Sequence, residues 1–184
     1  MLSNIRALQM KQVANTNLKK SIDRAIDLIG TPNDYEKYIS IKIKPAQGGC
    51  CCFHCWPETW TTINRHIYPY GPLKDEGDVL IGKNNERFVL ECHESGPEII
   101  VYLSLGTASI LLVKSVIDLI TTLLKALQNE HHRHSANFKI TKRYQIKDRV
   151  EEEEIMELEF PLDKDIIKKL NGKIRSALKK EESI

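Results

Sequence analysis

The sequence predicts an α+β protein in which small antiparallel sheets pack on a long apolar helix, with amphipathic helices at both ends of the chain. Three observations lead to this class. Strand-like segments, alternating or continuously apolar, occur before residue 105 and again after residue 137. A single long apolar segment separates the two groups, and apolar residues recur at helical spacing near each terminus. With 184 residues, 41% of them hydrophobic, the chain is long enough to bury a core.

In the N-terminal part, residue spacing and helix-breaking residues define the expected elements. An amphipathic helix is expected before Gly30, because apolar residues recur there at helical spacing and a Gly-Thr-Pro-Asn stop follows. Residues 39–43 alternate apolar and polar side chains, which is typical of a half-buried strand. Pro57 is expected to open a short helix, and the side chains of Trp56 and Trp60 should pack in the core.

The later part of the chain predicts strands before and after the long helix. Residues 79–81 and 87–93 flank a turn-forming Gly-Lys-Asn-Asn-Glu sequence and predict a hairpin, and residues 98–104 predict a buried strand. Between residues 138 and 160, two segments each place their apolar residues on one parity, which predicts an antiparallel hairpin. Asp163 is expected to cap a terminal helix with one apolar stripe.

Residues 107–128 form the long apolar segment. Lys114 and Asp118 lie one helical turn apart and share a narrow face, so we expect a nearly buried helix with one solvent-exposed stripe. A membrane span within residues 99–127 is the alternative, because about 20 apolar residues cross a bilayer. The two charges and the break at Gly106 favour a strand followed by a buried helix.

Length and charge limit the classes to which the chain can belong. We expect either one continuous domain or two regions, residues 1–78 with a cysteine-rich loop and residues 79–184 with a strand-strand-helix and hairpin-helix module. Lys and Arg total 27 against 25 Asp and Glu, so the net charge of +2 predicts no nucleic-acid partner. The N-terminus shows no secretory signal pattern, so we expect a cytoplasmic protein, with membrane association as the alternative.

The cysteines are the first candidate site. Cys52 and Cys55 form a Cys-x-x-Cys knuckle that can supply two of the four ligands of a structural zinc ion, and Cys92 and His66 are the candidates for the other two. Lipid modification, a redox role and buried thiols without a function are the alternatives. A cysteine nucleophile with a histidine base is the enzymatic version. We lean away from catalysis, because no third orienting group is evident and the chain carries no Walker loop, dinucleotide-binding glycine pattern or nucleophile elbow.

The long helix is the second candidate site, because apolar residues cover most of its circumference. A helix that rests on one sheet needs an apolar arc of only a little over about 100°. The amphipathic helices near the two ends of the chain can cover this remaining apolar surface, which would complete a monomer. We expect instead that a patch of it stays uncovered and meets a partner protein or a second copy of the chain. The residues predicted at this interface are Leu112, Val116, Leu119 and Leu123.

Charges in the C-terminal part form the third candidate. Residues 131–134, His-His-Arg-His, follow the apolar segment and suit the negative end of a helix dipole. On the expected hairpin, Lys139 and Arg143 occupy the parity opposite the apolar residues and can pair with the glutamates at 151–154. A solvated face is the simpler interpretation, and a docking surface for a charged peptide is the alternative.

From residue 98 to residue 180 the order of elements resembles a known family. An apolar strand, Gly106-Thr107, a long apolar helix, a basic linker, two short strands and a terminal helix are similar to the effector-associated constant component modules of bacterial conflict systems. The resemblance implies a non-catalytic adaptor that accompanies an effector protein. It carries over no functional residue. We therefore expect a protein–protein interaction or adaptor module, with a zinc-stabilised binding module, a membrane-associated protein and a Cys/His enzyme as the alternatives.

Overall fold

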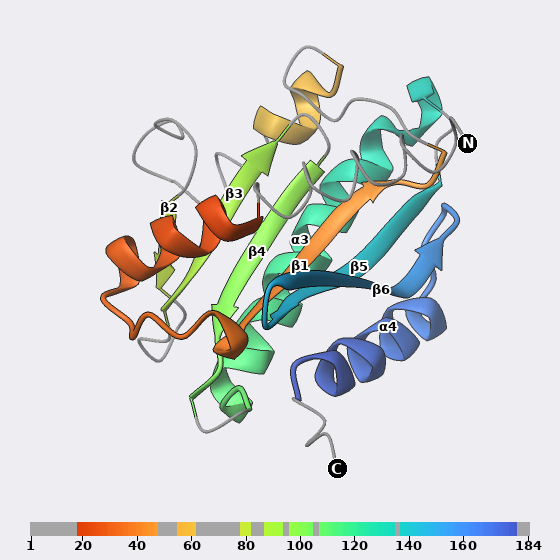
Figure 1. The fold of residues 1–184 in the computed structure, drawn as a ribbon. Coiled ribbons are helices and arrows are strands. Elements are labelled where there is room, and N and C mark those ends of the chain that lie inside the picture. The colour runs from red at the N-terminus through yellow and green to blue at the C-terminus, as the bar shows by residue number, and fades with distance from the viewer. Residues whose placement is uncertain are drawn as a thin grey trace, which may run out of the picture.

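The computed structural model describes residues 18–47, 55–61, 78–81, 87–93, 96–104, 107–134 and 137–179. The strands are β1 (Tyr38–Pro45), β2 (Asp78–Ile81), β3 (Arg87–His93), β4 (Gly96–Tyr102), β5 (Phe138–Ile146) and β6 (Arg149–Leu158). The helices are α3 (Ile110–His134), α4 (Lys164–Ala177), the 3-10 helix η1 (Tyr35–Lys37) and two helical segments over residues 18–29 and 57–61. These elements confirm the α+β class (Figure 1).

The six described strands join in one antiparallel sheet with the order β2-β3-β4-β1-β5-β6, so the small sheets expected from the sequence are a single sheet. Both predicted hairpins are confirmed, because β2 pairs with β3 and β5 pairs with β6. β1 lies in the middle and pairs with β4 on one side and β5 on the other. The regions before and after residue 78 therefore share one sheet.

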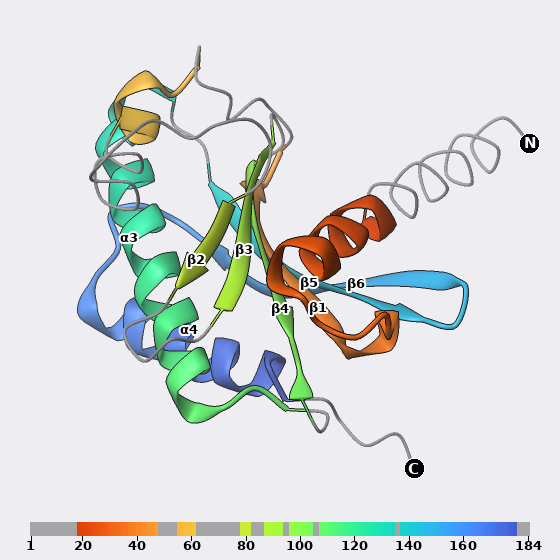
Figure 2. The same ribbon diagram turned by 90° about the vertical axis from the view of Figure 1, so that its left-hand side faces the viewer.

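One face of the sheet carries the main core. α3 crosses this face, and α4 and the helix over residues 57–61 pack beside it (Figure 2). Trp56 and Trp60 are buried there, as predicted, and the Trp56 ring lies 5.6 Å from the Phe138 ring of β5. The Thr59 hydroxyl donates a hydrogen bond to the Ala126 carbonyl of α3 at 3.2 Å. α3 is thus enclosed by more than the sheet alone.

The helix over residues 18–29 covers part of the opposite face of the sheet (Figure 2). It ends at Gly30, whose φ of +72° lies in the left-handed region that favours glycine. Its apolar side packs on Tyr38 of β1, Val89 of β3 and Ile100 of β4. β1 is therefore buried on both faces at Tyr38 and Ser40, whereas the alternating pattern predicted a half-buried strand.

The long helix is confirmed, although its bounds differ from residues 107–128. α3 begins at Ile110 and ends at His134, so the His-His-Arg-His sequence forms its last turn rather than following it. Lys114 and Asp118 are exposed, which confirms the predicted solvent-exposed stripe of this helix. The proposed membrane segment, residues 99–127, is divided between β4 and α3. Among the residues that the structure describes, no helix is long and apolar enough to cross a membrane.

The C-terminal elements, α4 and the β5–β6 hairpin, form the walls of the site described below. The Asp163 carboxylate caps α4, as predicted, by accepting a hydrogen bond from the Ile166 N–H at 2.7 Å. The β5–β6 ladder shifts register between Ile140 and Thr141, which pair with Met156 and Glu154. That shift leaves the intervening residue of β6, Ile155, as an extra residue, a β-bulge.

Candidate functional site

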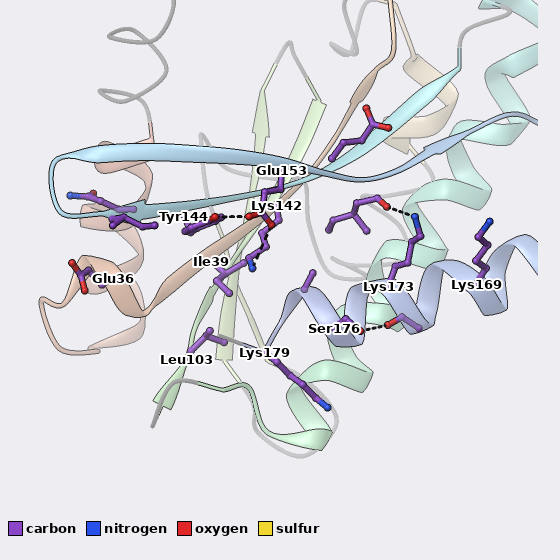
Figure 3. A pocket seen from close by; sticks show the side chains of 16 residues that line it. Glu36, Ile39, Leu103, Lys142, Tyr144, Glu153, Lys169, Lys173, Ser176 and Lys179 are labelled. Carbon is purple, nitrogen blue, oxygen red and sulfur yellow. Dashed lines mark hydrogen bonds and ion pairs between the residues drawn. The ribbon is translucent and has the colours of Figure 1, made fainter. Parts of the chain in front are cut away.

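A groove of about 890 Å³ lies between α4 and the β5–β6 hairpin (Figure 3). Its volume falls in the range of about 300–1,000 Å³ that is usual for ligand sites. The sheet, the bulge and α4 supply its main apolar lining. The apolar lining residues are Ile39, Leu103, Ile146, Ile155 and Ala177, of which Ile39, Leu103 and Ile155 are almost fully buried.

The α4 wall of the groove is basic. Lys169, Lys173 and Ser176 follow one another at i, i+4 and i+7, so they share one side of the helix. Lys173 Nζ donates a hydrogen bond across the groove to the Ile155 carbonyl at 2.9 Å. Within the described part of the chain, neither Lys169 nor Lys173 pairs with a carboxylate. No described carboxylate therefore forms an ion pair with either ammonium group at this end of the groove.

The hairpin wall is internally compensated. Lys142 Nζ lies 3.9 Å from Glu153 Oε2 and 4.8 Å from the centre of the Tyr144 ring. The Tyr144 hydroxyl donates a hydrogen bond to Glu153 Oε1 at 2.5 Å. Lys142 and Tyr144 are thus both held by Glu153, as the dashed lines in Figure 3 show.

The far end of the groove is acidic. Glu36 of η1 lies at the opposite end from Lys169 (Figure 3). Its carboxylate accepts a hydrogen bond from the Lys147 backbone N–H at 3.2 Å and forms no ion pair with a described residue. The groove therefore runs from a basic end to an acidic end over an apolar lining. A charged, partly apolar segment fits that arrangement better than a neutral one.

On the opposite face of the sheet, Glu98 is the centre of a buried charge network. Glu98 is 1% exposed. Arg143 Nη1, from two strands away, donates to both carboxylate oxygens at 2.9 and 3.1 Å. Ser40 also donates to this carboxylate, and Lys42 Nζ lies 3.6 Å from it. The network therefore joins β4, β1 and β5 through side chains as well as through the backbone ladder.

A second buried carboxylate continues the network toward the helix over residues 18–29. Glu91 of β3 stands directly opposite Glu98 in the register. Ser21 Oγ donates to Glu91 Oε2 at 2.5 Å, and Arg24 Nη1 lies 3.5 Å from Glu91 Oε1. Different cations thus compensate the two neighbouring carboxylates. This arrangement fixes the position of the N-terminal helix on the sheet.

The Lys42 ammonium makes this network sensitive to alkaline pH. Burial lowers the pKa of Lys42 from its usual 10.5, and the Glu98 carboxylate offsets part of that effect. The unfolded chain therefore holds this proton to higher pH than the folded protein does, so the contribution of Lys42 to stability rises as the pH rises toward 10.5. The unfolding free energy of the parent protein minus that of Lys42→Met should accordingly increase from neutral pH toward 10.5. Urea denaturation over this range measures the difference.

The contributions of two tyrosines to stability change with pH in the opposite direction. Both tyrosines are present in the parent protein and in Lys42→Met. Hydrogen bonding to Asp23 raises the pKa of Tyr35, and burial raises the pKa of Tyr38, from the usual 10.0. Both groups lose stabilising effect as the pH rises above 10.0. Because both proteins contain them, their effect cancels in the difference. A difference that decreases with pH would contradict the role given to Lys42.

Of the four predicted zinc ligands, only Cys55 has a side chain that the structure describes. Cys52 and His66 lie outside the described residues, and Cys92 lies in β3 with its side chain outside them. Cys55 is half-buried and packs against the main core. Among the side chains that the structure describes, no three His, Cys, Asp or Glu groups could hold a metal ion. The four-ligand site stays a prediction.

The four residues predicted at an interface lie in the core, which corrects that assignment. None of them is more than 8% exposed, because α4 and the helix over residues 57–61 cover sides of α3 that the sheet does not reach. These residues are Leu112, Val116, Leu119 and Leu123. The large apolar residues of α3 that are exposed are instead Ile110 and Leu111, at 80% and 47%.

Sequence patterns missed two features of this site. The spacing of Lys169 and Lys173 could have indicated a basic side of the terminal helix, but nothing local indicated what would face it. Glu98 and Arg143 are 45 residues apart, and β1 lies between their strands.

Comparisons with protein-family models, with curated proteins and with solved structures found no match.

Proposed function

We propose that the chain is a non-catalytic protein–protein interaction module, an adaptor that acts in the cytoplasm and contacts its partner through the start of α3. The observation that carries this proposal is the exposure of Ile110 and Leu111, at 80% and 47%, on a helix whose other large apolar residues are buried. Exposed apolar area contributes about 25 cal/mol per Å² when a partner removes it from water. A partner surface that covers both side chains would therefore bind favourably.

The residues that follow α4 lie beside the residues that precede α3. Thr107 and Lys179 form an isolated antiparallel bridge, and the Ala108 N–H donates to the Leu178 carbonyl at 3.3 Å. Lys179 also lines the groove. We call Ile110, Leu111 and Lys179 the helix-end surface. It combines an apolar centre with a polar margin, which is the usual make-up of a protein interface.

The architecture from residue 98 onward supports the same role. Its resemblance to the effector-associated constant component modules implies an adaptor that accompanies an effector of a bacterial conflict system. In this proposal the partner is that effector or a second copy of the chain. Either partner would cover the helix-end surface.

The double variant Ile110→Ser/Leu111→Ser tests the proposal. Because both side chains are exposed, the unfolding free energy should change by only about 0.5 kcal/mol. Binding should be lost, since the apolar contact area is removed. Affinity purification with the parent protein identifies the partner, calorimetry with that purified partner measures binding, and sedimentation measures self-association.

Leu112→Ser is the matched control, because Leu112 neighbours the surface but is buried. It should lower the unfolding free energy by about 2–5 kcal/mol, as polar truncations in a core do. Full binding by the double variant would contradict the proposal. So would a parent protein that is monomeric and binds no partner.

A further inference from the structure

We infer that the groove between α4 and the β5–β6 hairpin receives a short acidic segment of the partner protein. This inference rests on the proposed function and adds the chemistry of the partner. The helix-end surface and the groove share Lys179, so one partner can cover both. Three properties of the groove, its length, its charge and its apolar lining, support this occupant.

The length of the groove fits an extended peptide. Its α4 wall runs from Lys169 to Ala177, a helical rise of about 12 Å at about 1.5 Å per residue. An extended chain rises about 3.3 Å per residue, so about four residues lie along this wall. Gly172 sits within the wall, and no atom lies within 4 Å of the position where its Cβ would be. The backbone of a bound segment could therefore approach α4 closely there.

The charge of the groove selects an acidic segment. Lys142 is compensated by Glu153, and Glu154, which also lines the groove, pairs with Lys139, whereas Lys169 and Lys173 form no ion pair with a described carboxylate. Lys173 is held in place by its bond to the Ile155 carbonyl, and an ammonium group has three donors. Two donors remain for a carboxylate of the partner. Acidic side chains of the segment therefore lie at the Lys169 end, because Glu36 would repel them at the other end.

The apolar lining selects alternate side chains of the segment. Successive side chains of an extended chain point in opposite directions. Apolar residues of the segment can therefore contact Ile155 and Ala177, which keep some accessible surface, while the intervening acidic residues reach Lys169 and Lys173. An alternating pattern of leucine and glutamate satisfies both requirements.

Three synthetic peptides test this pattern on the full chain. They are acetyl-GLELEG-amide, its glutamine isostere acetyl-GLQLQG-amide and the lysine analogue acetyl-GLKLKG-amide, titrated to millimolar concentration. NMR shifts of the Gly172 amide and the Tyr144 ring report occupancy of the groove. We expect the glutamate peptide to bind about tenfold more tightly than the glutamine peptide, because two ion pairs distinguish them.

Reversing the charge of the α4 wall provides a second test of the inference. Lys169→Glu/Lys173→Glu should fold, because both side chains are exposed, and should prefer the lysine peptide over the glutamate peptide. Lys125→Glu is the matched control, since Lys125 is exposed on α3 and does not line the groove. It should keep the preference of the parent protein. An unchanged preference in the double variant would overturn the inference.

The remaining outcomes are also decisive. Equal shifts with the glutamate and glutamine peptides, or shifts outside the groove, would overturn the acidic segment. Equal affinity for acetylglutamate would assign the groove to a small anion instead. If the whole partner still binds the Lys169→Glu/Lys173→Glu variant but not Ile110→Ser/Leu111→Ser, the groove is rejected and the proposed function stands.

Discussion

Replacing Glu98 with alanine is expected to lower the free energy of unfolding by about 3–5 kcal/mol, the usual effect of removing one partner of a buried ion pair. Glu98 is 1% exposed and Arg143 is 5% exposed. Without the Glu98 carboxylate, the Arg143 guanidinium and the Lys42 ammonium lose their shared counter-charge while they stay out of bulk water. Urea denaturation at neutral pH measures the change.

Glu154→Ala is the control for that loss. Glu154 also pairs with a cation of β5, because Lys139 Nζ lies 3.0 Å from Glu154 Oε2, but solvent reaches both side chains, which are 29% and 49% exposed. Solvent screens such pairs, so the unfolding free energy should hardly change. Equal effects of Glu98→Ala and Glu154→Ala would show that the buried network does not stabilise the sheet.

Gly96→Ala is expected to lower the unfolding free energy by more than about 3 kcal/mol, or to prevent folding, because it combines two unfavourable effects. The φ of Gly96 is +116°, a conformation that side chains with a Cβ rarely adopt. A Cβ at this position would also lie 1.8 Å from the Ile43 carbonyl oxygen of β1. β4 would have to separate from β1 at its first residue. Thermal and urea denaturation test this expectation.

The matched substitution Gly172→Ala should have the opposite sign. Gly172 lies inside α4 and a Cβ there would meet no atom within 4 Å. Alanine in place of glycine should then stabilise the helix by about 0.5–1 kcal/mol. A stable Gly96→Ala protein, or a Gly172→Ala protein that is less stable than the parent, would contradict the backbone geometry.

The sequence predicted elements where local chemistry decides them. Asp163 caps α4 because its carboxylate reaches the third residue beyond it, a contact that depends only on neighbours. The Gly30 stop is likewise local. The predicted end of the long helix, residue 128, was wrong because it was placed where the apolar pattern stops. A helix continues until a breaking residue or a better partner for its backbone occurs, and α3 ends at His134. Residues 129–134 contain neither glycine nor proline.

Long-range order could not be predicted in this way. No local pattern shows that β1 enters the sheet between β4 and β5, and this insertion brings Glu98 to Arg143 and buries Ser40. The groove depends on the bulge at Ile155, whose carbonyl receives the Lys173 hydrogen bond from another element. Leu112 and Val116 became core residues for the same reason. Their cover comes from helices distant in the sequence.

Site-specific photo-crosslinking tests the role of the helix-end surface most directly. A photoreactive phenylalanine analogue is placed at Leu111 on that surface or at Lys125, which is also exposed on α3 but lies outside it. We predict that the analogue at residue 111 crosslinks to one defined partner or to a second copy of the chain in the source cells, and that the analogue at residue 125 does not. Equal crosslinking from both positions, or none from residue 111, would contradict an interaction module that binds through the start of α3.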